Sequence, residues 1–136
     1  MKLILVDDNL SFLEVLKFFI ENKLGHQVIA EANNGEEFLA LGNIGEAEVI
    51  LMDLIMKKTD GIEAAKKAIL RFPDLKLVAM TMNTEKAVKD RLKETGFKGV
   101  ISKNEIFVFL ESILQSVYSN KVEFSEIIKS TMGSRD

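Results

Sequence analysis

The sequence predicts an α/β protein in which five short parallel strands form one sheet with helices on both faces, a three-layer sandwich. Short apolar runs alternate with longer stretches that carry apolar residues at helical spacing. Continuous apolar runs suit strands that are buried on both faces of a parallel sheet. A regular strand-helix alternation favours such a sheet over separate helical and strand regions.

Five strand-helix units follow one another along the chain. The expected strands are residues 3–6, 28–30, 49–52, 75–80 and 100–101, and the expected helices are residues 10–23, 36–41, 62–71, 84–95 and 105–118. Gly25, Pro73 and Gly96 mark helix ends, because glycine and proline commonly end helices. Right-handed crossovers restrict the topology, and the flavodoxin-like strand order 2-1-3-4-5 is the natural choice for five strands.

Length and composition indicate one domain. The chain has 136 residues, of which 47% are hydrophobic and 29% charged, as expected for a globular protein. We expect the domain to span residues 1–118. Residues 119–136 hold few apolar positions and end in polar residues, so we expect a C-terminal tail or a short extra helix there.

Composition also excludes several classes of function. The net charge of -3 gives no reason to expect binding to nucleic acid. The absence of cysteine excludes disulfides and thiolate metal sites. No apolar stretch approaches the ~20 residues that span a membrane. We therefore expect a cytoplasmic protein with no membrane or nucleic-acid partner.

Polar residues that can do chemistry follow four of the five expected strands. They are Asp7 and Asp8 after the first strand, Asp53 after the third, Thr81 after the fourth and Lys103 after the fifth. In an open parallel sheet, sites form beyond the carboxyl ends of the strands. The strand order 2-1-3-4-5 therefore brings all five side chains into one crevice.

The three carboxylates require a positive counter-charge. Two unit charges about 4 Å apart interact by about 4 kcal/mol at an effective dielectric constant of about 20. Lys103 supplies one positive charge, and a hard divalent cation bound through carboxylates and water, in the manner of Mg²⁺, supplies more. An aspartate nucleophile with metal and ammonium beside it is suited to phosphoryl transfer, and the hydroxyl of Thr81 can donate to a phosphate oxygen.

These features resemble response-regulator receiver domains over roughly residues 1–118. The stretches that carry the resemblance are LILVDDN, VILMDLIMKKTDG, LVAMTMN and GVISKN. The resemblance implies that Asp53 accepts the phosphoryl group, that Lys103 pairs with it and that Thr81 turns inward to hydrogen-bond it.

The resemblance also implies a metal site for Mg²⁺ or Mn²⁺. Asp8 and Asp53 would bind the metal directly, Asp7 mostly through water, and the backbone carbonyl of Ile55 would complete the protein ligands. The resemblance implies no enzyme activity beyond the protein's own phosphorylation and slow dephosphorylation.

The function so implied is that of a stand-alone receiver. Its phosphodonor would be a sensor histidine kinase or a phosphotransfer protein, and its output would be a changed surface that binds an unknown downstream protein. Phe12, Phe18, Phe107 and Val108 fall outside the main apolar stripes of their helices. We expect them to be buried or partly buried, the alternative being contact with a kinase, a phosphotransfer protein or a second copy in a homodimer.

Three other functions compete with this one. A degenerate receiver that serves only as a protein-interaction module is the main alternative, since Met82 replaces the usual small residue and Val100 the usual aromatic of the family. A phosphohydrolase would need a second aspartate at position 9, which is Asn9. A flavin-binding protein would need a phosphate loop rich in Ser, Thr and Gly after the first strand.

Simpler structural roles are expected for some residues. Asp7 and Asp8 taken alone would cap helix 10–23, an interpretation that the presence of Asp53 and Lys103 disfavours. Gly61 is expected to be a turn glycine with positive φ. His26, the only histidine, is expected to be a surface residue without partners and not a phosphotransfer site.

Overall fold

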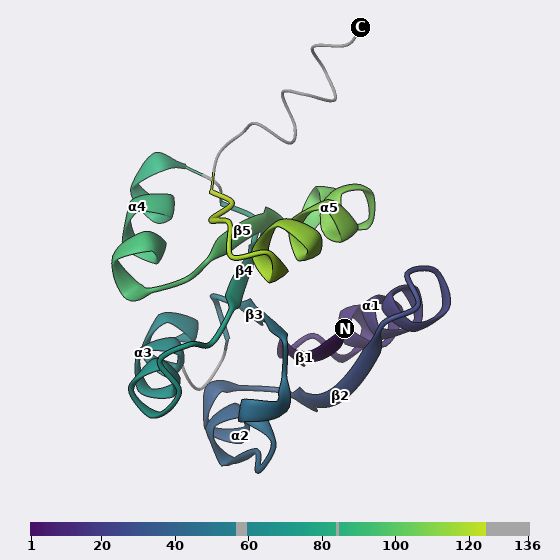
Figure 1. Ribbon diagram of the computed structural model, residues 1–136, viewed down its shortest axis with the longest axis horizontal. Coiled ribbons are helices and arrows are strands. Elements are labelled where there is room, and N and C mark those ends of the chain that lie inside the picture. The colour runs from purple at the N-terminus through teal and green to yellow at the C-terminus, as the bar shows by residue number, and fades with distance from the viewer. Residues whose placement is uncertain (57–59, 84, 125–136) are drawn as a thin grey trace, which may run out of the picture.

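Five parallel strands form the central sheet of the computed structural model, which describes residues 1–56, 60–83 and 85–124 (Figure 1). The strands are β1 (Lys2–Val6), β2 (Gln27–Ala32), β3 (Val49–Asp53), β4 (Leu77–Thr81) and β5 (Gly99–Ser102). They are ordered β2-β1-β3-β4-β5, and every pairing is parallel. The predicted fold class and strand order are both confirmed.

Helices cover both faces of the sheet. They are α1 (Leu10–Asn22), α2 (Gly35–Ala40), α3 (Gly61–Arg71), α4 (Lys86–Thr95) and α5 (Ile106–Tyr118), with short 3-10 turns η1 (Ile44–Glu46) and η2 (Lys103–Glu105). Figure 1 shows α1 and α5 on one side of the sheet and α2, α3 and α4 on the other. Among the described residues, no helix is both long and apolar enough to cross a lipid bilayer.

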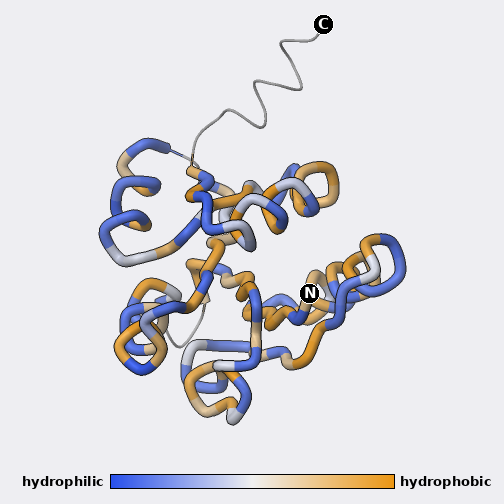
Figure 2. Tube along the Cα trace, viewed as in Figure 1, coloured by the Kyte–Doolittle hydropathy of each residue, from blue (hydrophilic) through white to orange (hydrophobic). Residues whose placement is uncertain are grey.

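Alternate residues of the strands build the two halves of the core. Leu3 and Leu5 of β1 pack with the buried faces of α1 and α5, whereas Ile4 and Val6 pack with those of α2 and α3. This alternation follows from the two-residue period of a strand. Apolar residues gather along the strands in Figure 2, while α4 is mostly hydrophilic and buries only Leu92.

Local signals in the sequence set the helix ends. The side chain of Asn9 accepts a hydrogen bond from the N–H of Phe12 at 3.0 Å and so caps α1. The aspartates before it are therefore not the cap. Gly96 ends α4 with a φ of 114°, a left-handed conformation that suits glycine.

The apolar residues outside the helix stripes are more exposed than expected. Phe18 is 60% exposed, Val108 67% and Phe107 41%, so the expectation of burial is wrong for these three. Phe12 is partly buried, as expected. The sheet covers one stripe of each helix, and Phe18 and Val108 lie beyond that stripe.

The segment after α5 returns to the edge of the sheet. Glu123 pairs with Gly99: its N–H donates to the carbonyl of Lys98 at 2.9 Å, and its carbonyl accepts from the N–H of Val100 at 3.0 Å. Phe124 is 4% exposed and belongs to the same core cluster as Val100. Residues 121–124 therefore extend the fold beyond α5. Residues 125–136 lie outside the described part of the chain.

We predict that Phe124→Ala lowers the free energy of unfolding by about 3 kcal/mol, because removing a buried phenylalanine leaves a cavity. Urea unfolding followed by circular dichroism measures the change. Val122→Ala is the matched control in the same segment, since Val122 is 57% exposed, and it should change stability by less than about 0.5 kcal/mol. Equal stability of the two variants would show that this segment does not support the core.

Candidate functional site

The topology of the sheet gathers the candidate residues at one edge. Asp7 and Asp8 directly follow β1, and Asp53 ends the neighbouring strand β3. Thr81 ends β4, where it pairs with Ser102 of β5, and Lys103 comes next in the chain. The carboxyl ends of adjacent parallel strands meet at one edge, so the sequence order alone brings these side chains together.

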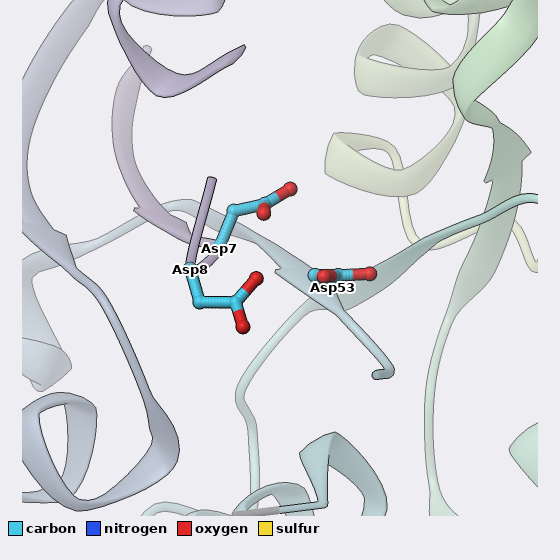
Figure 3. Close-up of side chains that lie close together, drawn as sticks. All are labelled: Asp7, Asp8 and Asp53. Atoms are coloured by element: carbon cyan, nitrogen blue, oxygen red, sulfur yellow. The ribbon is translucent and has the colours of Figure 1, made fainter. Parts of the chain in front are cut away.

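Three aspartates form an acidic cluster at this edge (Figure 3). One carboxylate oxygen from each of Asp7, Asp8 and Asp53 lies within 4.8 Å of the others. Asp7 is fully buried, Asp53 is 7% exposed, and Asp8 is partly buried. Burial weakens the screening of these like charges by water, so the cluster favours the binding of a positive group.

Lys103 supplies positive charge inside the cluster. Its Nζ lies 2.7 Å from Oδ2 of Asp7 and 3.5 Å from Oδ2 of Asp53. The same Nζ lies over the ring of Phe12 on α1, 4.8 Å from the ring centroid. The side chain of Lys103 is only 18% exposed. The ammonium is therefore held between two carboxylates and an aromatic face.

The two carboxylate oxygens of Asp7 have different partners. Its Oδ1 accepts a hydrogen bond from the N–H of Asn9 at 2.9 Å. Its Oδ2 is buried and makes an ion pair with Nζ of Lys103 at 2.7 Å, and no other donor contacts it among the described residues. The triad is consistent with a divalent metal site, since hard cations take carboxylate oxygens.

The surroundings of Asp53 shift the pKa of its carboxyl group. Burial, and after it the negative charge of Asp7, raises the pKa of Asp53 from 3.8 to about 6, although Lys103 and a hydrogen bond from the backbone N–H of Ile55 act to lower it. Most Asp53 side chains are still ionised at pH 7. The carboxylate is the form that can attack an electrophile.

Ile55 and Thr81 lie near this edge in different ways. The backbone N–H of Ile55 contacts Asp53, while its side chain is 83% exposed. Thr81 is 5% exposed, and its hydroxyl accepts from the N–H of Asn83 at 3.0 Å and donates to the carbonyl of Asn83 at 3.2 Å. Its contacts are thus with the loop after β4.

Gly61 has a role that the sequence analysis assigned wrongly. Its φ is not positive. A Cβ at this position would lie 2.5 Å from the carbonyl oxygen of Asp53 and 3.0 Å from Cα of Leu54. Glycine is required because the start of α3 approaches the backbone of Asp53 too closely for a side chain. A glycine for close approach and a glycine for a turn look alike in sequence.

His26 was also interpreted wrongly as a residue without partners. Its Nε2 lies 2.8 Å from Oε1 of Glu111 on α5, and its Nδ1 lies 3.0 Å from the amino group of Met1. The His26 side chain is 11% exposed. His26 thus joins the loop before β2 to α5.

The two departures from the receiver pattern lie in different environments. Met82 is 65% exposed, whereas Val100 is 8% exposed and packs in the core. Val100 therefore has no large side chain that can turn between a buried and an exposed position.

Comparison with known proteins agrees with this arrangement. The family model described as "Response regulator receiver domain" matches residues 3–115. The chain is 29% identical over 118 residues to the Response regulator UvrY of Escherichia coli, which covers 87% of this chain and 54% of UvrY. It is 28% identical over 102 residues to the Transcriptional regulatory protein DegU of Brevibacillus brevis, which covers 75% of this chain and 43% of DegU. The chain thus spans about half the length of these curated relatives.

Solved structures share the fold. A two-component response regulator of the LuxR family from Aurantimonas superposes with a TM-score of 0.85 at 23% identity, covering 98% of this chain and 96% of that one. The isolated receiver domain of RcsB from Salmonella enterica, solved in the presence of the phosphomimetic BeF3-, gives 0.75 at 24% identity, covering 90% and 91%.

We predict that Asp53→Asn raises the free energy of unfolding at pH 7, in metal-free buffer, by about 3 kcal/mol. A carboxyl whose pKa is higher in the folded state than in the unfolded state costs stability above the unfolded value, here 3.8, and the cost grows until the pH passes about 6. The increase in the free energy of unfolding of Asp53→Asn should therefore vanish below about pH 4.

Urea unfolding from pH 4 to pH 7 measures this gain, with Asp74→Asn at an exposed position as the control. A variant that is less stable than the wild type at pH 7 would contradict the balance of charges described above.

Proposed function

The chain belongs to the response-regulator receiver family, and from this premise we propose that it is a phosphorylatable switch whose acceptor is Asp53. Membership of the family also means that the chain carries out no catalysis beyond its own phosphorylation chemistry. It further implies a cognate histidine kinase.

One observation carries the proposal: an ionisable carboxylate at the end of a central strand faces an ammonium within the same cluster of charges. Asp53 has Lys103 Nζ at 3.5 Å, and Asp7 and Asp8 contribute oxygens within 4.8 Å. A nucleophile, a fixed cation and neighbouring carboxylates that can hold a metal ion are the groups that phosphoryl transfer to an aspartate needs.

In the proposed reaction, a carboxylate oxygen of Asp53 attacks the phosphorus of a phosphohistidine on a kinase or phosphotransfer protein. The new P–O bond forms as the P–N bond to the histidine breaks, and the electron pair of the P–N bond leaves with the imidazole. Lys103 stabilises the charge on the phosphoryl oxygens, and the hydroxyl of Thr81 hydrogen-bonds one of them after leaving its contact with Asn83. Fixed charges of this kind usually make the largest contribution to the rate enhancement of phosphoryl transfer.

We further propose that Mg²⁺ or Mn²⁺ binds at the triad. Asp8, Asp53 and the backbone carbonyl of Ile55 would hold it directly, with Asp7 acting mostly through water. When bound, such an ion neutralises charge on the phosphoryl group. The three carboxylates, which bring oxygens within 4.8 Å of one another, support a cation at this place.

The output we propose is a changed surface that binds a downstream protein in the cytoplasm. The prediction that the receiver acts alone stays a prediction, because the curated relatives are about twice as long as the matched region. A homodimer through apolar residues such as Phe18 and Val108, which are 60% and 67% exposed, is a further proposal.

The alternative is a degenerate receiver that only binds proteins. Val100 favours it, because a small core residue in place of the family's aromatic removes the usual response to phosphorylation. Asp7, Asp8, Asp53, Thr81 and Lys103 are all present, however. A module that is never phosphorylated has no need of this set.

We predict that incubation with acetyl phosphate and Mg²⁺ increases the intact mass of the protein by one phosphoryl group, because Asp53 is ionised at neutral pH. Mass spectrometry should show no increase without Mg²⁺ and none for Asp53→Asn. Asp74→Asn, at an exposed position, is the matched control and should be modified like the wild type. An unmodified wild type would favour the degenerate module, and a modified Asp53→Asn would place the acceptor elsewhere.

A further inference from the structure

We infer that Phe12 is a positioning residue that holds the ammonium of Lys103 at the acidic cluster; this inference rests on the proposed function. The Nζ of Lys103 lies 4.8 Å from the centroid of the Phe12 ring, over its face. The same atom lies 2.7 Å from Asp7 and 3.5 Å from Asp53. Phe12 is thus the third group around the ammonium.

The aromatic face has a specific electrostatic effect. A lysine ammonium sits on a flexible four-carbon stem, and its position is fixed only by what surrounds it. The face of an aromatic ring carries partial negative charge and attracts a cation, most strongly where water is excluded. Lys103 is 18% exposed. An aliphatic side chain at position 12 would exclude water equally but would offer the ammonium no attraction.

The ring of Phe12 is itself held by aromatic packing between α1 and α5. Its centroid lies 6.4 Å from that of Phe107, with the planes inclined by 59°. Phe107 in turn makes an edge-to-face contact with Phe19 at 5.0 Å and 82°. Both helices lie on the same side of the sheet (Figure 1). The position of the ammonium therefore depends on how α1 packs against α5.

This arrangement prepares Lys103 for the reaction. The ammonium is already beside Asp53 before a phosphoryl group arrives, so little order has to be created during transfer. Phe12 acts through Lys103 and not through the carboxylates. Losing its ring should slow transfer and leave the metal ligands intact.

The test compares Phe12→Leu, Phe12→Tyr and Phe19→Leu with the wild type. The rate of phosphorylation by acetyl phosphate should fall about threefold to tenfold in Phe12→Leu, the range expected from one cation–π contact. Phe12→Tyr keeps a ring face and should restore most of the rate. Phe19→Leu removes a ring that contacts Phe107, so it disturbs Phe12 only indirectly and should lower the rate less than Phe12→Leu does.

Mg²⁺ affinity, measured by calorimetry, separates positioning from structural damage. It should be unchanged or higher in Phe12→Leu, because a freer ammonium competes less with the metal for the carboxylates. A parallel loss of rate and Mg²⁺ affinity, an equal loss of rate in Phe19→Leu, or a wild-type rate in Phe12→Leu would overturn the inference. Circular dichroism confirms that each variant is folded.

A third readout needs no phosphorylation. Ring currents of Phe12 should shift the NMR signals of the Lys103 ε-methylene protons upfield in the metal-free protein. The shift should be lost in Phe12→Leu and kept in Phe12→Tyr. A wild type that accepts no phosphoryl group would overturn the proposed function. The Lys103 signals would then still decide whether Phe12 holds the ammonium, and unshifted signals would overturn that too.

Discussion

The concentration of negative charge at one edge of the sheet is the constraint on which the site depends. Asp7, Asp8 and Asp53 bring oxygens within 4.8 Å of one another, and two of these residues are buried. Only a nearby positive charge makes this arrangement tolerable. Lys103 supplies part of it, and the raised pKa of Asp53, about 6, shows that the repulsion and burial are not fully offset. A site with negative charge that is not fully offset favours the binding of another cation.

The sheet accounts for the precision of the site. β1 and β3 are adjacent and fully buried along the residues that lead to the aspartates. The register of these two strands sets the positions of the aspartates relative to one another. Gly61 lets the start of α3 approach the backbone of Asp53. Groups that must act together are thus carried by rigid strands, and Ile55 and Thr81 come from the strand ends and loops beside them.

The sequence was sufficient for the strand order and for the gathering of Asp7, Asp8, Asp53 and Lys103. Apolar runs reveal strands, and parallel strands present their carboxyl ends on one side. Contacts between segments distant in sequence were not predictable in this way. The contact of Phe12 with Lys103 depends on how α1 packs against α5.

Two further contacts were unpredictable for the same reason. Glu111 meets His26 across 85 residues of sequence, and no local pattern encodes such a contact. Phe124 enters the core because Glu123 pairs with the edge of β5, although its surroundings in the sequence are polar.

The most direct test of this account is the stability of the wild type against urea as Mg²⁺ is added, at constant ionic strength kept with potassium chloride. If the acidic cluster binds the ion in the folded state only, the free energy of unfolding should rise by about 1.4 kcal/mol at a Mg²⁺ concentration ten times the dissociation constant. Asp8→Asn should show a smaller rise because one ligand is lost. Stability that does not change with Mg²⁺ would contradict the claim that the cluster is built to receive a cation.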